Sequence, residues 1–244
     1  MLGQILEIDV DPQLPSFVSD GLTLTRGHVA GDPGSPAWMA RCPAALGRVP
    51  GQVQAVFPPG CLRGISQPLL LTVPDGGVLY RHEILHVMQP WLREDSQVLC
   101  LHQKSSGAVV YRYAPELEFL LVCSQKHRHW GIPKGNMEPG ELENQTAIRE
   151  VFEETGQRID LEPPFREVIA FRMDDLPRYK QVAFFLAQGR ATPLVRNPEE
   201  HCDIAWVPWQ RALELIPFPK DRGVLECAVQ QLGRVSQLAA VNQC

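Results

Sequence analysis

The stretch that decides the fold of this chain reads Gly135-Asn-Met-Glu-Pro-Gly-Glu-Leu-Glu-Asn-Gln-Thr-Ala-Ile-Arg-Glu-Val-Phe-Glu-Glu-Thr-Gly156. Its pattern predicts a turn that leads into a helix. Glu150, Glu153 and Glu154 are spaced at i, i+3 and i+4, which places their carboxylates within one turn on one face of that helix. The side chains expected on the opposite, core-facing side are Ile148, Val151, Phe152 and Thr155.

Three carboxylates at this spacing repel one another. On a wet helix surface the repulsion costs about 0.2–0.5 kcal/mol per pair, whereas in a partly dry cleft it rises to roughly 3 kcal/mol per pair. A hard divalent cation relieves the repulsion, and an all-oxygen ligand set suits Mg²⁺, with Mn²⁺ as the alternative. The residues therefore predict a metal site of the kind that binds phosphate.

The same residues resemble the signature of the Nudix hydrolases, G-x5-E-x7-R-E-U-x-E-E-x-G-U, in which U is aliphatic. The chain matches every fixed position and departs at the last one, where Gln157 replaces an aliphatic residue and Ile159 is the candidate apolar anchor. An isolated E-x-x-E-E would be better interpreted as a solvated acidic helix face. Gly135, Glu141 and Arg149 at their signature positions argue against that interpretation.

Composition sets broad limits on the function. The chain has 244 residues, 44% of them hydrophobic and 21% charged, which is ordinary for a globular protein. The net charge of −5 and the absence of a basic block disfavour a nucleic acid as the main partner. No signal peptide or membrane span is predicted. Seven scattered cysteines without a C-x-x-C pair predict a reducing compartment, with the cytoplasm as the default.

Two regions of different texture are predicted. Residues 1–104 are rich in proline and glycine and predict short strands and loops, with a helix near 80–92; their role is not readable from the sequence. From residue 105 onward, strands and helices alternate in an α+β arrangement. The Nudix resemblance implies an α/β/α sandwich with a mixed sheet over residues 105–240. The elements expected there are strands at 107–113, 117–123, 167–173, 179–188 and 203–207, and helices at 209–216 and 219–233.

Segments outside the signature resemble the asymmetrical dinucleoside tetraphosphate hydrolases. These segments are Trp130–Gly135, Lys180–Ala187, the Glu200–His201 pair and Phe218–Arg222. The resemblance implies that Lys134 and Lys180 contact a polyphosphate and that Phe184 helps to hold an adenine. Members of that group often carry histidine at the position of Asn136 and tyrosine at that of Phe184, so these two departures concern the exact substrate.

The resemblance implies hydrolysis of a phosphoanhydride by metal-activated water. The metal ligands expected are Glu150, Glu153, Glu154 and the carbonyl of Gly135. A carboxylate of the signature or Glu200 would accept the proton, and Arg149 would pair with Glu141 to hold the loop. The expected substrate is a nucleotide or polyphosphate small molecule, first of all diadenosine tetraphosphate, cleaved to ATP and AMP.

Several alternatives stay open. Other Nudix substrates include capped or 5′-triphosphorylated RNA ends, diphosphoinositol phosphates and nucleotide sugars. A second alternative is a regulatory protein that senses a nucleotide. A third is the H-E-x-x-H string formed by His82, Glu83 and His86, which is typical of zinc proteases. Three fixed residues arise easily by chance, and Pro90 and Trp91 follow where a protease signature would continue.

Overall fold

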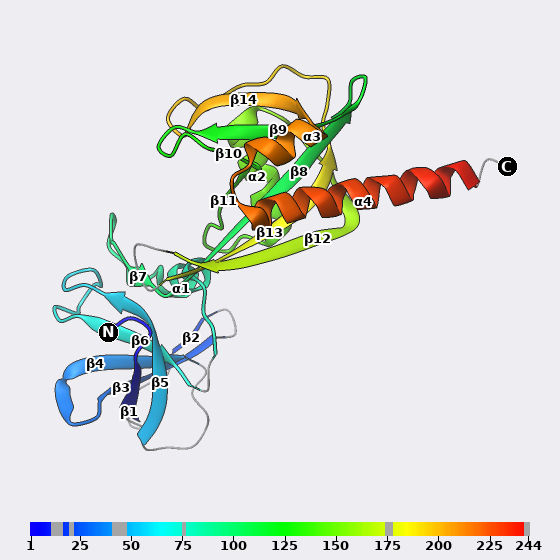
Figure 1. Cartoon of the computed structure of the whole chain (residues 1–244). Coiled ribbons are helices and arrows are strands. Elements are labelled where there is room, and N and C mark those ends of the chain that lie inside the picture. The colour runs from blue at the N-terminus through cyan, green and yellow to red at the C-terminus, as the bar shows by residue number, and fades with distance from the viewer. Residues whose placement is uncertain (11–16, 20–21, 41–47, 75–76, 174–177, 242–244) are drawn as a thin grey trace. The chain divides into compact units, whose positions relative to one another are not determined.

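The computed structural model describes residues 1–10, 17–19, 22–40, 48–74, 77–173 and 178–241 (Figure 1). The chain divides into two compact units. The first comprises Met1–Lys104 together with Phe171–Lys180, and the second comprises Ser105–Ala170 together with Gln181–Cys244. Among the described residues, no helix combines the length and the apolar character that a membrane crossing requires.

The first unit is built on a closed ring of five strands. Strand β1 pairs with both β3 and β5; β3 continues to β4, β4 pairs in parallel with β6, and β6 pairs with β5. Two short strands join the ring by antiparallel pairing: β2 pairs with β3, and β7 pairs with β5. The bounds are β1 Ile5–Val10, β2 Phe17–Ser19, β3 Leu22–Val29, β4 Asp32–Ala40, β5 Arg48–Phe57, β6 Leu69–Val73 and β7 Leu99–Cys100.

The core of the first unit follows from strand alternation. Successive side chains of a strand point to opposite faces, and β4 accordingly divides its residues between two clusters. Ala37 and Met39 pack with Ile8, whereas Trp38 packs with Phe57. Helix α1 (Arg81–Met88) contributes Ile84 to the second cluster. All five residues of β6 are buried; four are apolar, and the hydroxyl of Thr72 donates to the carbonyl of Trp38.

The second unit contains a seven-stranded mixed sheet. Its order is β10-β9-β8-β13-β12, with β11 paired to β8 and β14 paired to β9. The bounds are β8 His102–Tyr113, β9 Leu117–Ser124, β10 Trp130–Gly131, β11 Lys134–Asn136, β12 Leu161–Arg172, β13 Tyr179–Gln188 and β14 His201–Pro208. The predicted strands are all present, and β12 begins six residues earlier than the expected 167–173.

Helices cover both faces of this sheet (Figure 1). Two successive residues of β8 pack on opposite faces: Val109 packs with Leu225 of α4, and Val110 packs with Val151 of α2. The helices are α2 Glu143–Thr155, α3 Trp209–Leu215 and α4 Pro219–Val241, the last longer than the predicted 219–233. The α+β fold with an α/β/α sandwich in this part of the chain is therefore confirmed.

Helix α2 differs from the amphipathic pattern that its sequence predicts. Val151 and Thr155 are buried as expected, but Ile148 and Phe152 are 40% and 45% exposed. The helix instead buries two glutamates, Glu150 and Glu154. The side of α2 that is buried therefore includes Glu150 and Glu154 and leaves out Ile148 and Phe152. The guanidinium of Arg158 covers the ring of Phe152 from 4.9 Å.

Gly156 ends α2 in the left-handed conformation, with φ of 72°. Its N–H donates to the carbonyl of Phe152 at 2.8 Å, which closes the last turn. The next residue, Gln157, is buried and donates its amide to Thr192. Ile159 is 4% exposed and packs with Val151, so it supplies the apolar anchor that Gln157 does not.

We predict that Gly156→Ala destabilises the protein by at least about 1 kcal/mol, because the φ is positive and the added Cβ would lie 2.9 Å from Val195. Gly233→Ala is the matched control, since its Cβ would meet nothing within 4 Å and alanine favours a helix. Urea unfolding followed by tryptophan fluorescence measures both. Equal stability changes in the two variants would contradict the role of Gly156.

Candidate active site

The centre of the site is a close contact between a loop and α2. Strand β11 pairs with β8 and holds the backbone of Gly135 opposite Ser106. A Cβ on Gly135 would lie 2.0 Å from the carboxylate of Glu150. Only a residue without a side chain lets Glu150 come this close to the loop. The lack of room for a Cβ at this position explains why the signature has a fixed glycine there.

A second buried carboxylate lies beside the first. Glu154 is 4% exposed, and its Oε2 accepts the backbone N–H of Lys134 at 2.9 Å. Its Oε1 lies 3.0 Å from Nε2 of His201. Glu150 and Glu154 thus contact the Lys134–Gly135 backbone from one helix, at positions i and i+4.

Arg149 organises the acidic residues around this loop. Its guanidinium donates to both carboxylate oxygens of Glu141, at 2.7 and 2.8 Å, and to the carbonyl of Asn136 at 3.0 Å. It also donates to Glu150 at 2.8 Å and to Glu153 at 3.0 Å. The hydrogen bonds from Arg149 are the main reason that the pKa of Glu141 falls to about 2.

Glu150 is electrostatically different from Glu141. Burial raises its pKa from 4.5 to about 7; Arg149 opposes this change, whereas the charges of Glu154 and Glu153 add to it. Without a cation, Glu150 is therefore protonated in part of the molecules at neutral pH. A divalent cation bound beside it would favour the ionised form, so the donor set of Glu150, Glu154 and the Gly135 backbone fits a hard metal ion.

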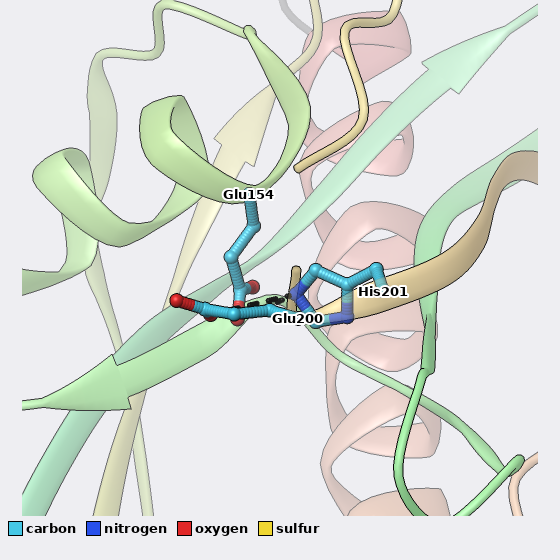
Figure 2. Close-up of side chains that lie close together, drawn as sticks. All are labelled: Glu154, Glu200 and His201. Carbon is cyan, nitrogen blue, oxygen red and sulfur yellow. Dashed lines mark ion pairs between the residues drawn. The ribbon is translucent and has the colours of Figure 1, made fainter. Parts of the chain in front are cut away.

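The start of β14 brings two further side chains to Glu154. His201 pairs with Ser124 and Asp203 with Cys123, so Cys202 is an extra residue in the strand. Its Sγ lies 3.0 Å from Sγ of Cys123. Figure 2 shows the carboxylate of Glu200 and the ring of His201 next to Glu154; one ligand atom from each of the three lies within 4.8 Å of the others.

His201 is a site residue that the sequence interpretation did not assign. The motif contains the Glu200–His201 pair, yet only Glu200 is expected to act. Neighbouring side chains of a regular strand point to opposite faces. Glu200 lies in the turn that precedes β14 and His201 is the first residue of the strand, so this alternation does not apply to the pair, and both side chains approach Glu154. The residue at which a strand begins carries only a weak sequence signal.

The structure does not bring every predicted site residue to this cluster. Glu153 is half-exposed and contacts Arg149, whereas Glu200 is exposed but does lie in the cluster beside Glu154. Phe184 is completely buried and packs with Val109 and Phe119 in the core. Its ring has no free face for an adenine, because β13 turns this side chain toward α3 and α4. Lys180 ends the segment that clusters with the first unit and is not placed relative to the site.

A group of rings and charges lies near Lys134. The ring of His129 stacks on His127 at 5.7 Å and meets Phe218 edge-on at 5.0 Å. Phe218 is 47% exposed. Burial raises the pKa of Asp221, while the charges of Lys134 and His129 lower it. Phe218 and Asp221 both belong to the segment that the sequence interpretation singled out.

The H-E-x-x-H string lies on α1 in the first unit. The carboxylate of Glu83 accepts the backbone N–H of Tyr80 at 2.8 Å and so caps the helix. Within the part of the chain that the structure describes, neither His82 nor His86 belongs to a group of three metal-compatible side chains. The structure thus assigns the glutamate of this string a structural contact rather than a catalytic one.

Residues 102–226, just over half of the chain, match the NUDIX domain family model. The chain therefore belongs to the Nudix family, and it is a pyrophosphohydrolase of that family. It is 32% identical over 120 residues to the asymmetrical bis(5′-nucleosyl)-tetraphosphatase of Caenorhabditis elegans. The aligned region covers 47% of this chain and 86% of the relative. The corresponding enzyme of Sus scrofa is 34% identical over 115 residues, covering 45% and 77%.

A solved structure agrees with these relatives. The crystal structure of a C. elegans Ap4A hydrolase binary complex is similar with a TM-score of 0.50 and 26% identity, covering 54% of this chain and 98% of that one. An 8-oxo-(d)GTP phosphatase of Mycolicibacterium smegmatis is 27% identical over 140 residues, covering 52% of this chain and 42% of the relative. The similar proteins thus act on nucleotides of more than one kind.

We predict that Glu150→Gln stabilises the metal-free protein in a pH-dependent way. Between about pH 4.5 and 7 the folded state binds more protons at Glu150 than the unfolded state does, so this group lowers stability as pH rises. Glutamine removes that effect. In EDTA, the variant should match the parent at pH 4 and exceed it by about 1–3 kcal/mol at pH 8.

Urea unfolding at the two pH values measures this difference. Glu214→Gln is the matched control, because Glu214 is an exposed acid on α3 that pairs with Arg211. Its effect should stay within about 0.5 kcal/mol at both pH values. A Glu150→Gln variant that is less stable than the parent at pH 8 would show that the carboxylate is not held at an electrostatic cost.

Proposed function

We propose that this Nudix pyrophosphohydrolase acts on dinucleoside polyphosphates and cleaves diadenosine tetraphosphate asymmetrically to ATP and AMP. The observation that carries the proposal is the seating of two buried carboxylates, Glu150 and Glu154, against the Lys134–Gly135 backbone. The relatives that are named as asymmetrical tetraphosphatases support the choice of substrate. The cytoplasm is the compartment that we propose, on the cysteine pattern of the sequence.

Mg²⁺ is the metal ion that we propose for this site, with Mn²⁺ as the alternative. Glu150, Glu154 and the carbonyl of Gly135 would hold it, with Glu153 and Glu200 at its edge. A divalent ion held there would neutralise phosphate oxygens and lower the pKa of bound water. The raised pKa of Glu150 supports the assignment, because a carboxylate that is buried beside two other acids gains most from a cation.

The remaining roles fall to side chains around the two glutamates. Glu200 is exposed next to Glu154, and the candidate acceptors of the proton from water are Glu200 and a carboxylate of the signature. Glu154 accepts the backbone N–H of Lys134, which fixes Lys134 beside the site, so its ammonium group can contact the polyphosphate. Arg149 touches four oxygen-bearing groups and acts as a positioning residue that holds Glu150 and the loop in register.

The base of the substrate needs a surface other than Phe184. Phe218 is exposed and its ring meets His129, which brings two aromatic side chains together near Lys134. A purine could stack on such a surface, because every base presents an apolar face. We therefore assign adenine binding to His129 and Phe218 in this proposal and no longer to Phe184.

We predict that the purified protein with Mg²⁺ converts diadenosine tetraphosphate to ATP and AMP, resolved by anion exchange. Glu154→Gln should lower kcat/KM by at least about 10²-fold, because it removes charge from the site while preserving shape. Glu214→Gln, the exposed acid on α3, should stay within about twofold of the parent.

The products separate the alternatives. Two molecules of ADP would contradict asymmetric cleavage, and a folded Glu154→Gln variant with near-parental turnover would contradict the metal assignment. Absence of cleavage in the parent would contradict this substrate. A panel of 8-oxo-dGTP, ADP-ribose, diphosphoinositol phosphate and 5′-triphosphorylated RNA would then identify another phosphoanhydride, and failure across the panel would favour a nucleotide sensor.

A further inference from the structure

The imidazole of His201 is a buried polar group whose hydrogen bonds are not made. The residue is 6% exposed, and neither ring nitrogen has a hydrogen-bond partner among the residues that the structure describes. Nε2 nevertheless lies 3.0 Å from Oε1 of Glu154 and 4.0 Å from Oε2 of Glu200. Figure 2 shows the ring of His201 facing the carboxylate of Glu154 with Glu200 beside it, although neither ring nitrogen is aligned to donate a hydrogen bond.

These distances are the ones that neighbouring ligands of a single ion have. With metal–ligand bonds of about 2.1 Å, adjacent ligands of an octahedral ion lie ~3.0 Å apart and opposite ligands ~4.2 Å apart. The three candidate ligand atoms lie within 4.8 Å of one another, so modest side-chain rotation closes them around one ion. A metal would also satisfy the lone pair that the buried imidazole otherwise leaves unused.

We propose that His201 joins Glu154 and Glu200 in a mixed nitrogen–oxygen metal site, which favours Mn²⁺ and Co²⁺ over Mg²⁺. The inference rests on the proposed function, because Glu154 is shared with the hydrolytic site. It adds a nitrogen ligand that the signature does not contain. Imidazole is a good ligand for transition metals, whereas Mg²⁺ prefers oxygen and gives up its water reluctantly.

The competing role for His201 is that of a hydrogen-bond donor that orients Glu154. Two features argue against it. The contact at 3.0 Å lacks hydrogen-bond alignment. Glu154 is already oriented by the backbone N–H of Lys134.

The test uses the whole protein with Mn²⁺ alone, without nucleotide. Pulsed electron paramagnetic resonance should detect ¹⁴N coupling from one imidazole in the parent, and His201→Gln should abolish it. Mn²⁺ affinity, measured by titration of the free-ion signal, should fall at least about 10-fold in that variant, since even indirect partners of ligands are worth 10–100-fold. Mg²⁺ affinity by competition should change less than about threefold, so the preference for Mn²⁺ shrinks.

His86→Gln is the matched control, because it removes a histidine from the H-E-x-x-H string and leaves the Glu154 cluster intact. It should keep the ¹⁴N coupling and the Mn²⁺ affinity of the parent. Loss of the coupling in His86→Gln but not in His201→Gln would place the ion elsewhere and overturn the proposal. Absence of ¹⁴N coupling in the parent would overturn it without any variant.

The outcome is separable from that of the proposed function. Cleavage of diadenosine tetraphosphate by a parent protein that shows no nitrogen coupling would refute only the role of His201. Nitrogen-coupled Mn²⁺ in a protein that leaves this substrate intact would refute only the substrate. If His201→Gln does not fold, as judged by circular dichroism in EDTA, His201→Asn replaces it, and coupling that persists in a folded His201→Asn variant would overturn the proposal.

Discussion

The guanidinium of Arg149 is the constraint on which the site depends. It touches Glu141, Glu150, Glu153 and the carbonyl of Asn136, so one cation holds the start of the loop to the middle of α2. Without that charge, the acids of one helical turn would repel one another and the loop would lose its main attachment. The contacts of Arg149 with these carboxylates do not include Glu154, which instead contacts Lys134 and His201. The region beside Gly135 therefore stays negative enough for a metal ion.

The pKa values of Glu141 and Glu150 shift in opposite directions, and the two residues differ accordingly in whether they stabilise the fold or serve the site. Glu141 has a pKa of about 2 and binds Arg149 tightly, which stabilises the fold. Glu150 has a pKa of about 7 because the fold buries it beside other acids, which costs stability until a cation arrives. Glu141 therefore holds the loop in place, whereas Glu150 favours the binding of a cation. This is the usual relation between an active site and the scaffold that supports it.

The scaffold brings together three segments that are distant in the sequence. Strand β11 provides the backbone of Lys134 and Gly135, α2 provides Glu150 and Glu154, and the junction between a turn and β14 provides Glu200 and His201. Each is tied to the same sheet, β11 through β8 and β14 through β9. The hydrophobic cores on the two faces of β8 fix the positions of these segments, since α2 packs on one face and α4 on the other. Rigid elements rather than long loops carry most of the site.

The sequence by itself determined what depends on local spacing. The i, i+3, i+4 glutamates, the glycine before them and the paired Arg149 and Glu141 lie within 22 residues, so one turn and one helix suffice to bring them together. The alternation of apolar runs likewise determined the α+β class. Only the tertiary structure decided which side chains face the core. It buried Phe184, exposed Phe152 and turned Glu150 inward, because helix rotation and strand face are set by packing against the sheet. It also brought His201 to Glu154, because a contact between residues so far apart in the sequence depends on how β14 pairs with the sheet and leaves no trace in local spacing.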